Sequence, residues 1–305
     1  MKVLKFGGTS VADSRSIDKV ISILESNDGP LFVVVSALSG ITNLLQKCLN
    51  SKGESVDDII SEIEHRHLEI ITNLCDGNHQ TSLKNFLSDN LNELNDLLNE
   101  MSETSEVSIE KKSKVLTLGE ILSSNIIYEI IRQRGLDIFY IDSRELIFTK
   151  DSNNNIQLDD EKTSDSISKI VGSVKSKLII SPGYICSNHE GKTYNLGRGG
   201  SDYSAAIYAK YLNAKVLEIW TDVSGVFSAN PKIVKKASPI SYLSYKEAME
   251  LSFFGAKVIY FPTLQPLIED NIPVFIKNTF KPDEEGTCIS NSTKLDNDEV
   301  VKGIS

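Results

Sequence analysis

The sequence predicts an α/β protein with a mainly parallel sheet that is covered by helices on both faces. Short apolar segments alternate with longer amphipathic ones, and glycine-rich turns follow several of the short segments. This alternation is typical of parallel sheets joined by crossover helices. Of the 305 residues, 40% are hydrophobic, which is enough for one large core or two smaller ones.

The expected elements follow one another in a βα rhythm. A first strand over residues 3–6 leads through a glycine turn into a helix with apolar positions from Val11 to Leu24. A second strand over 31–35 leads through a loop of small residues into a helix from Ile41 to Leu49. Later strands are expected at 137–141, 177–180, 216–220 and 274–276. Later helices are expected at 118–134, 201–212 and 244–257.

A helical insertion over about residues 53–115 interrupts this rhythm. Its apolar residues recur every three or four positions, namely Leu83, Phe86, Leu87, Leu91, Leu94, Leu97, Leu98 and Met101. This spacing favours a helix that covers its own domain over a helix that binds a partner. The polar stretch 151–160, which contains SNNN, predicts a turn or exposed loop, and the GKT of residues 191–193 predicts a hairpin tip.

Charge and composition exclude several function classes. The formal net charge is −10, and residues 51–115 hold 14 acidic but only 6 basic residues, so the rest is nearly neutral. Without clustered Lys and Arg we expect no nucleic-acid partner. The N-terminus MKVLKFGGTS lacks the apolar region of a signal peptide, and no apolar run approaches the roughly 20 residues that cross a bilayer. We therefore expect a cytoplasmic protein with no membrane partner.

Cysteine and histidine patterns point to no metal centre. Cys48, Cys75, Cys186 and Cys288 are far apart, and a chain of this length needs no disulfides, so we expect buried free thiols. On a helix, His65 and His67 would point away from each other.

Glycine-rich motifs suggest where an anion could bind. A Walker A loop fails because Cys186 stands at its first glycine, and a dinucleotide fingerprint fails because Asp202 stands at its third. In KFGGTS, by contrast, Lys5 ends a strand and Gly7 and Gly8 open the turn into a helix, which suits a phosphate. An ordinary tight turn is the alternative.

Two further motifs each allow two interpretations. In NLGRGGSDYSAA, Ser201 or Asp202 could merely cap a helix, or Arg198 could grip a carboxylate through two hydrogen bonds. In FFGAKV, Lys257 could interact with a helix C-terminus or with a ligand.

Taken together, the motifs resemble the aspartokinase catalytic domain of the amino-acid kinase superfamily. The matching segments are KFGGTSV at 5–11, VVSALSGITNLL at 34–45, LGE at 118–120, LGRGGSDYSAA at 196–206, WTDVSGVF at 220–227 and SYKEAMELSFFGAKV at 244–258. The resemblance implies a three-layer αβα sandwich, with a catalytic domain over 1–290. It divides into an aspartate-binding N-lobe, 1–195, and an ATP-binding C-lobe, 196–290.

The implied reaction transfers the γ-phosphoryl of MgATP to the side-chain carboxylate of L-aspartate, the first step of lysine, threonine and methionine biosynthesis. A carboxylate is already a nucleophile at neutral pH, so alignment and charge neutralisation are the catalytic needs. Lys5, with Gly7 and Gly8, would contact the transferring phosphoryl, and Lys257 would offset charge from the opposite side. Asp202 would either orient Lys5 or support Mg²⁺.

The resemblance also implies binding residues for both substrates. Arg198, with Gly199 beside it, would bind the α-carboxylate of aspartate, and Glu120 would receive the ammonium. Ser36 and Thr42 would donate hydrogen bonds near the substrate carboxylates. The nucleotide would be lined by Thr221, Asp222, Phe227, Lys232, Lys257 and Val258.

The chain departs from the family pattern at two places, which bear on nucleotide affinity. Asn230, Pro231 and Lys232 stand where the family has Asp, Pro and Arg, and Ile259, Tyr260 and Phe261 stand where it has Leu, His and Pro. Residues 291–305 are expected to form a linker and the start of a missing ACT-type regulatory domain, and a homodimer is expected of the full-length enzyme. The alternatives are another amino-acid kinase or a catalytically inactive binding paralogue.

Overall fold

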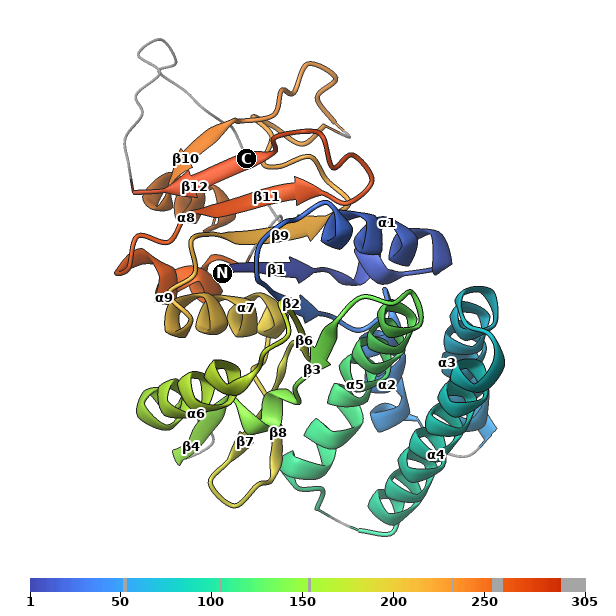
Figure 1. Ribbon diagram of the computed structural model, residues 1–305. Helices are drawn as coiled ribbons and strands as arrows, with labels where there is room; N and C mark the ends of the chain where they lie inside the picture. Colours follow the sequence, from blue (N-terminus) through green and yellow to red (C-terminus); the bar gives the residue numbers. More distant parts are fainter. Residues whose placement is uncertain (52–53, 105, 153–154, 232, 254–259, 292–305) are drawn as a thin grey trace.

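The computed structural model describes residues 1–305 except 52–53, 105, 153–154, 232, 254–259 and 292–305 (Figure 1). It confirms the predicted α/β architecture. An eight-stranded sheet has the order β10-β12-β11-β9-β1-β2-β6-β3. The strands are β1 (Lys2–Phe6), β2 (Leu31–Val35), β3 (Ile138–Tyr140), β6 (Leu178–Pro182), β9 (Leu217–Thr221), β10 (Tyr242–Ser244), β11 (Val274–Asn278) and β12 (Thr287–Ser290). All neighbours pair in parallel except β11 and β12, which are antiparallel.

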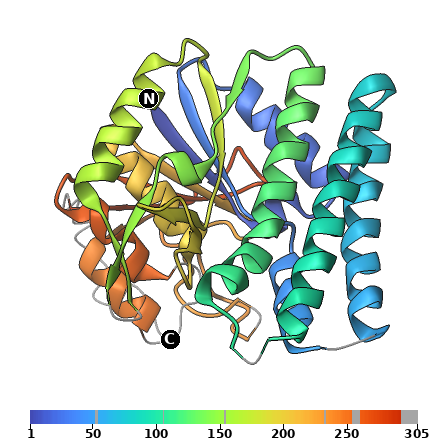
Figure 2. The same ribbon diagram turned by 90° about the horizontal axis from the view of Figure 1, so that it is seen from below.

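Helices cover both faces of this sheet, which gives the three layers (Figure 2). One layer contains α1 (Ser14–Glu25), α2 (Ile41–Asn50), α3 (Glu54–Leu74), α4 (Gly77–Ser102) and α5 (Ile109–Gln133). The other contains α6 (Asp160–Ser173), α7 (Gly200–Tyr211), α8 (Tyr245–Phe253) and α9 (Gln265–Ile268). Successive strand residues point to opposite faces, so Leu4 and Phe6 join the first core whereas Val3 joins the second.

The turn after β1 differs from the sequence expectation. The 3-10 helix η1 (Gly8–Val11) lies between the glycines and α1, so Gly7 and Gly8 do not open the α-helix directly. Helix α1 begins at Ser14, because the Asp13 side chain accepts a hydrogen bond from the backbone N–H of Ser16 at 2.8 Å. An effective N-cap seven residues beyond the strand end therefore sets the start of the helix.

The insertion folds as two long helices packed on the first layer. Helices α3 and α4 lie side by side at its outer edge (Figures 1 and 2). The leucine stripe of α4 faces inward, with Leu83, Leu87, Leu91 and Leu94 buried in the first core. The prediction that these helices cover their own domain is thereby confirmed.

Helix α5 begins nine residues earlier than the expected residue 118. The Ser108 side chain caps it by accepting from the backbone N–H of Lys111 at 3.2 Å, and Val115 is already buried. Lys-rich sequence favours helix and holds no breaker, so the helix runs unbroken from the insertion into the catalytic part. The expected insertion boundary at residue 115 therefore falls inside a helix.

A second sheet, which was not predicted, has the order β5-β4-β7-β8. Its strands are β4 (Phe148–Ser152), β5 (Asn155–Leu158), β7 (Ile185–Asn188) and β8 (Thr193–Asn195). The stretch 151–160, expected to be a turn or exposed loop, instead contains the end of β4, strand β5 and the start of α6, because residues 155–158 pair with β4. The expected hairpin tip near Gly191 is confirmed, since Gly191 has a φ of +78° between β7 and β8.

The other sequence expectations are met in part. All four cysteines are free, and Cys48, Cys75 and Cys186 are buried as predicted, whereas Cys288 is partly exposed. Histidine 67 is buried and His65 is exposed, so the two side chains diverge as expected on α3. No helix in the described part of the chain is both long and apolar enough to span a membrane.

Candidate active site

A cleft of about 750 Å³ opens where four parallel strands end. The loops that follow β1, β2, β6 and β9 all contribute to its wall, together with the N-terminal turn of α7 and the middle of α5. In a parallel sheet the carboxyl ends of the strands meet at one edge, which is where open α/β proteins bind ligands. The predicted residues that line this cleft are Lys5, Gly7, Gly8, Ser36, Thr42, Glu120, Arg198, Gly199, Asp202, Thr221 and Asp222.

Lys5 and Asp202 form an ion pair inside the cleft. Their Nζ and Oδ1 atoms are 2.7 Å apart, and the side chains are only 10% and 15% exposed. Lys5 comes from β1 and Asp202 from the first turn of α7, so the pair joins two elements that are distant in the sequence. The capping interpretation of Ser201 and Asp202 is wrong, because the N-cap of α7 is Gly199, in the left-handed conformation and without a side-chain hydrogen bond.

The glycine turn approaches the neighbouring loop closely. A Cβ on Gly8 would lie 2.9 Å from the Ala37 carbonyl oxygen, so only glycine fits there without a shift of backbone. The Gly7 N–H donates to the Trp220 carbonyl at 3.0 Å and is therefore already used. The N–H groups of Gly8 and Thr9 open η1 and have no partner within it.

Glu120 is a buried carboxyl on the cleft side of α5. It is 4% exposed, and burial raises its pKa to about 8, although the Ala37 backbone N–H and nearby Lys5 act in the opposite direction. Its Oε2 atom has no hydrogen-bond partner. A buried, half-satisfied carboxyl at a cleft is complementary to a cationic group of a ligand.

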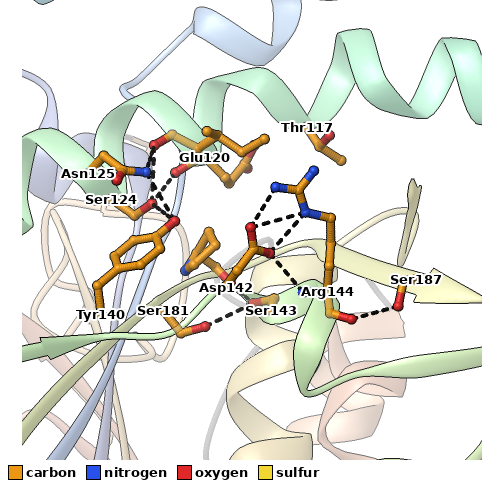
Figure 3. A network of polar contacts seen from close by, with 12 residues as sticks. Thr117, Glu120, Ser124, Asn125, Tyr140, Asp142, Ser143, Arg144, Ser181 and Ser187 are labelled. Carbon is orange, nitrogen blue, oxygen red and sulfur yellow. Dashed lines mark hydrogen bonds and ion pairs between the residues drawn. The ribbon is translucent and has the colours of Figure 1, made fainter. Parts of the chain in front are cut away.

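A polar network supports α5 next to Glu120 (Figure 3). The Ser124 hydroxyl donates to the Glu120 carbonyl at 2.6 Å, and the Asn125 amide donates to the Tyr140 hydroxyl at 3.1 Å. Tyr140 ends β3, so these contacts join the helix to the edge of the large sheet.

Arg198 is exposed at the mouth of the cleft. Within the described chain it makes no ion pair with a carboxylate, and its guanidinium lies over the ring of Tyr260, 5.1 Å from the ring centroid. Its flanking residues Gly197 and Gly199 have φ angles of +72° and +70°, which place the loop in a conformation that favours glycine. Because no carboxylate of the described chain pairs with it, the Arg198 guanidinium is available to bind an anion.

The remaining predicted residues separate into three groups. Thr221 and Asp222 line the cleft at the end of β9, and the Thr221 hydroxyl donates to the Asp222 carboxylate at 3.1 Å. Phe227 is not among the residues that line the cleft, and its backbone forms an isolated bridge with Pro239. Its contact with the nucleotide stays a prediction. Lys232, Lys257 and Val258 lie outside the described residues.

Several residues of the cleft were not predicted from the sequence, and Tyr184 is the most unusual of them. It has a φ of +70°, which is rare for a bulky side chain and which costs conformational energy. Its place four residues after the predicted strand 177–180 was the available signal, since loops at carboxyl strand ends build such sites. The other overlooked residues are Thr9, Ala37, Leu38, Ser39, Gly40, Asn43, Gly197, Gly200 and Ser201.

Comparisons with known proteins agree with this geometry. The sequence profile of the Amino acid kinase family matches residues 1–278. An aspartokinase of Chlamydia pneumoniae is 34% identical over 94% of this chain and 62% of its own length. A bifunctional aspartokinase/homoserine dehydrogenase of Arabidopsis thaliana is 33% identical over 94% of this chain and 32% of its own length. The chain thus spans between about a third and just under two thirds of these relatives.

Solved structures show the same likeness. The structure of Escherichia coli aspartokinase III in complex with aspartate and ADP has a TM-score of 0.89 and 30% identity, over 97% of this chain and 65% of that one. A UMP kinase of Bacillus anthracis has a TM-score of 0.51 at 15% identity over 96% of both chains, which is a likeness of fold alone.

Proposed function

This chain belongs to the amino acid kinase family, and from that premise we propose that it transfers the γ-phosphoryl group of MgATP to the side-chain carboxylate of L-aspartate. The products are 4-phospho-L-aspartate and ADP. The relatives named above are aspartokinases or carry an aspartokinase part, and the E. coli structure is described as holding aspartate and ADP. The chemistry of the cleft supports the proposal independently of these relatives.

The observation that carries the proposal is the complementarity of the cleft to an amino acid with two carboxylates. The unpartnered oxygen of Glu120 suits an ammonium group, and the free guanidinium of Arg198 suits a carboxylate. Ser36 and Thr42 line the same cleft and can donate hydroxyl hydrogen bonds to the substrate. Lys5 lies in the same cleft and can neutralise a phosphoryl group brought to the second carboxylate.

The residues present can promote this reaction without a general base. The acceptor carboxylate is ionised at neutral pH, so its oxygen can attack phosphorus as soon as the two are aligned. Negative charge on the phosphoryl oxygens would be offset by the Lys5 ammonium, which Asp202 holds in place at 2.7 Å. We therefore assign Asp202 to the orientation of Lys5. The N–H groups of Gly8 and Thr9, which have no partner within η1, can donate to phosphate oxygens.

The donor set also fits a magnesium ion that arrives with the nucleotide. Mg²⁺ is usually bound by one or two carboxylates, water and substrate phosphates. Asp222 provides such a carboxylate at the rim, whereas the described residues include no group of three or more His, Cys, Asp or Glu side chains suited to a metal. When bound, the ion would neutralise phosphate charge.

The test is a hydroxylamine trap. Incubation of the protein with MgATP, L-aspartate and hydroxylamine should accumulate aspartyl hydroxamate, because an acyl phosphate reacts with that amine. ADP release should be compared with glutamate, acetylglutamate, carbamate and UMP as acceptors, which separates the other kinases of this fold. ADP formation without hydroxamate would contradict the proposal, and no ADP with any acceptor would favour an inactive paralogue.

Three wider expectations concern the full-length protein. Homodimerisation, the cytoplasmic location and regulation through an ACT-type domain all stay predictions. Of residues 291–305, which were expected to form the linker and the start of that domain, all but Asn291 lie outside the described residues.

A further inference from the structure

We propose that Tyr260 is a positioning residue for Arg198, holding the guanidinium at the mouth of the cleft in the orientation that receives a carboxylate. This inference rests on the proposed function, because it concerns the binding of the α-carboxylate of aspartate. Tyr260 itself does not line the cleft and is 41% exposed, so it acts on the substrate only through Arg198.

The first observation is the contact between the Arg198 guanidinium and the Tyr260 ring. The Arg198 guanidinium carbon lies 5.1 Å from the Tyr260 centroid, within the range of a cation–π contact. A guanidinium that is packed on its planar face keeps its N–H groups available at the edge, where a carboxylate binds in a two-hydrogen-bond arrangement. In this conformation the ring restricts the side chain of Arg198 without competing for its hydrogen bonds.

The second observation is steric and concerns the backbone of the same loop. A Cβ on Gly199 would lie 3.1 Å from the Tyr260 Cβ and 3.0 Å from Thr263 Cγ2, so the loop is pressed against the segment that carries the tyrosine. The Tyr260 carbonyl in turn accepts from the backbone N–H and the hydroxyl of Thr263, at 3.0 and 2.7 Å. Tyr260 is thus anchored where it meets Arg198.

A second tyrosine holds the loop from the other side. A Cβ on Gly200 would lie 2.5 Å from Tyr184 Cδ2, so the backbone of Gly200 rests on that ring. Tyr184 follows β6, whereas Tyr260 directly precedes the 3-10 helix η3 (Phe261–Leu264), which packs against α7. The loop that carries Arg198 is therefore held between two aromatic residues, one in the β6–β7 turn and the other at the start of η3.

The experiment compares Tyr260→Leu and Tyr260→Phe in the intact chain, with the hydroxamate assay as readout. The leucine variant should raise the aspartate KM roughly three- to fivefold, as expected for an exposed cation–π contact, with kcat and the ATP KM within twofold of wild type. The phenylalanine variant keeps the ring and should stay within twofold of wild type for all three constants. The matched control is Tyr211→Leu, which removes another tyrosine beside a cation at the far end of α7, where Lys210 lies 5.7 Å from the ring centroid.

A double-mutant cycle separates positioning from general damage. Arg198→Ala should raise the aspartate KM roughly ten- to hundredfold, because hydrogen bonds between charged groups are lost. Adding Tyr260→Leu to that variant should change the aspartate KM less than twofold, since no guanidinium remains to be positioned.

Three outcomes would overturn the inference while leaving the proposed function intact. They are a wild-type aspartate KM in Tyr260→Leu, an equal loss in Tyr260→Phe, and a full Tyr260→Leu effect in the absence of Arg198. Failure of the wild-type chain to phosphorylate aspartate would instead overturn the proposed function, and this inference with it.

Discussion

The cleft and the α3–α4 pair place their charges in opposite ways. In the cleft, Lys5, Glu120 and Asp202 are largely buried and belong to three different elements. In the helical pair, acidic residues such as Glu69 and Asp89 are exposed, and the leucine stripe is what is buried. The pair contains more charged residues than the cleft, but its charged side chains remain in water. In the cleft, the charged side chains are held in fixed positions, which costs desolvation free energy and conformational freedom. The position of charge, rather than its amount, distinguishes the two regions.

The sharpest test of this comparison removes the buried cation. Lys5→Ala should lower kcat by about 10² to 10³, with a smaller change in the aspartate KM, because a fixed charge matters most as phosphoryl charge redistributes. It also leaves Asp202 without its partner at 2.7 Å, so thermal unfolding should be measured alongside the kinetics. An equal effect on kcat and on both KM values would argue against this role.

The buried carboxyl predicts a pH dependence of aspartate binding. Burial raises the pKa of Glu120 to about 8, so the free enzyme holds it mostly protonated at pH 7. Binding of an ammonium group favours the ionised form, which means that binding releases a proton and strengthens as pH rises. The aspartate KM should therefore fall by roughly tenfold or more between pH 6 and pH 8. Glu120→Gln should weaken binding and remove this dependence; a flat profile in the wild type would contradict the assignment.

A substitution in the leucine stripe should affect stability and leave chemistry unchanged. Leu87 is fully buried in the first core, so Leu87→Ala should cost about 2–5 kcal/mol of unfolding free energy and lower Tm by roughly 4–10 °C. Assayed well below that Tm, the variant should keep the wild-type kcat and aspartate KM. A selective change in KM would show that the insertion acts on the cleft.

Neutralising exposed charges on the pair should have the smallest effect. Glu69→Gln, Asp89→Asn and Asp96→Asn remove acidic side chains from the solvent face, where substitutions usually change stability by about 0.5 kcal/mol or less. Activity and Tm should stay close to wild type in the combined variant. Lost activity at an unchanged Tm would assign the insertion a direct functional role.

Much of the cleft could be predicted from the sequence, because its chemistry is carried by local motifs. Lys5, Gly8 and Arg198 stand in short segments whose residue types already limit what they can do, and parallel strands bring such segments to one edge. The family resemblance also assigns Phe227 to the nucleotide, yet Phe227 is not among the residues that line the cleft, and its backbone bridges to Pro239. A motif defines residue types but does not determine where each side chain points.

The sequence by itself determined the βα rhythm, the inward-facing leucine stripe and the glycine turns, since these depend on periodicity and on local backbone preference. Only the tertiary structure decided that Asp202 pairs with Lys5 instead of capping α7, and that the polar stretch after β4 forms a strand. It also decided the burial of Glu120 and the seating of the Arg198 loop between two tyrosines. Each of these depends on contacts between residues far apart in the chain, and such contacts leave no local pattern to read.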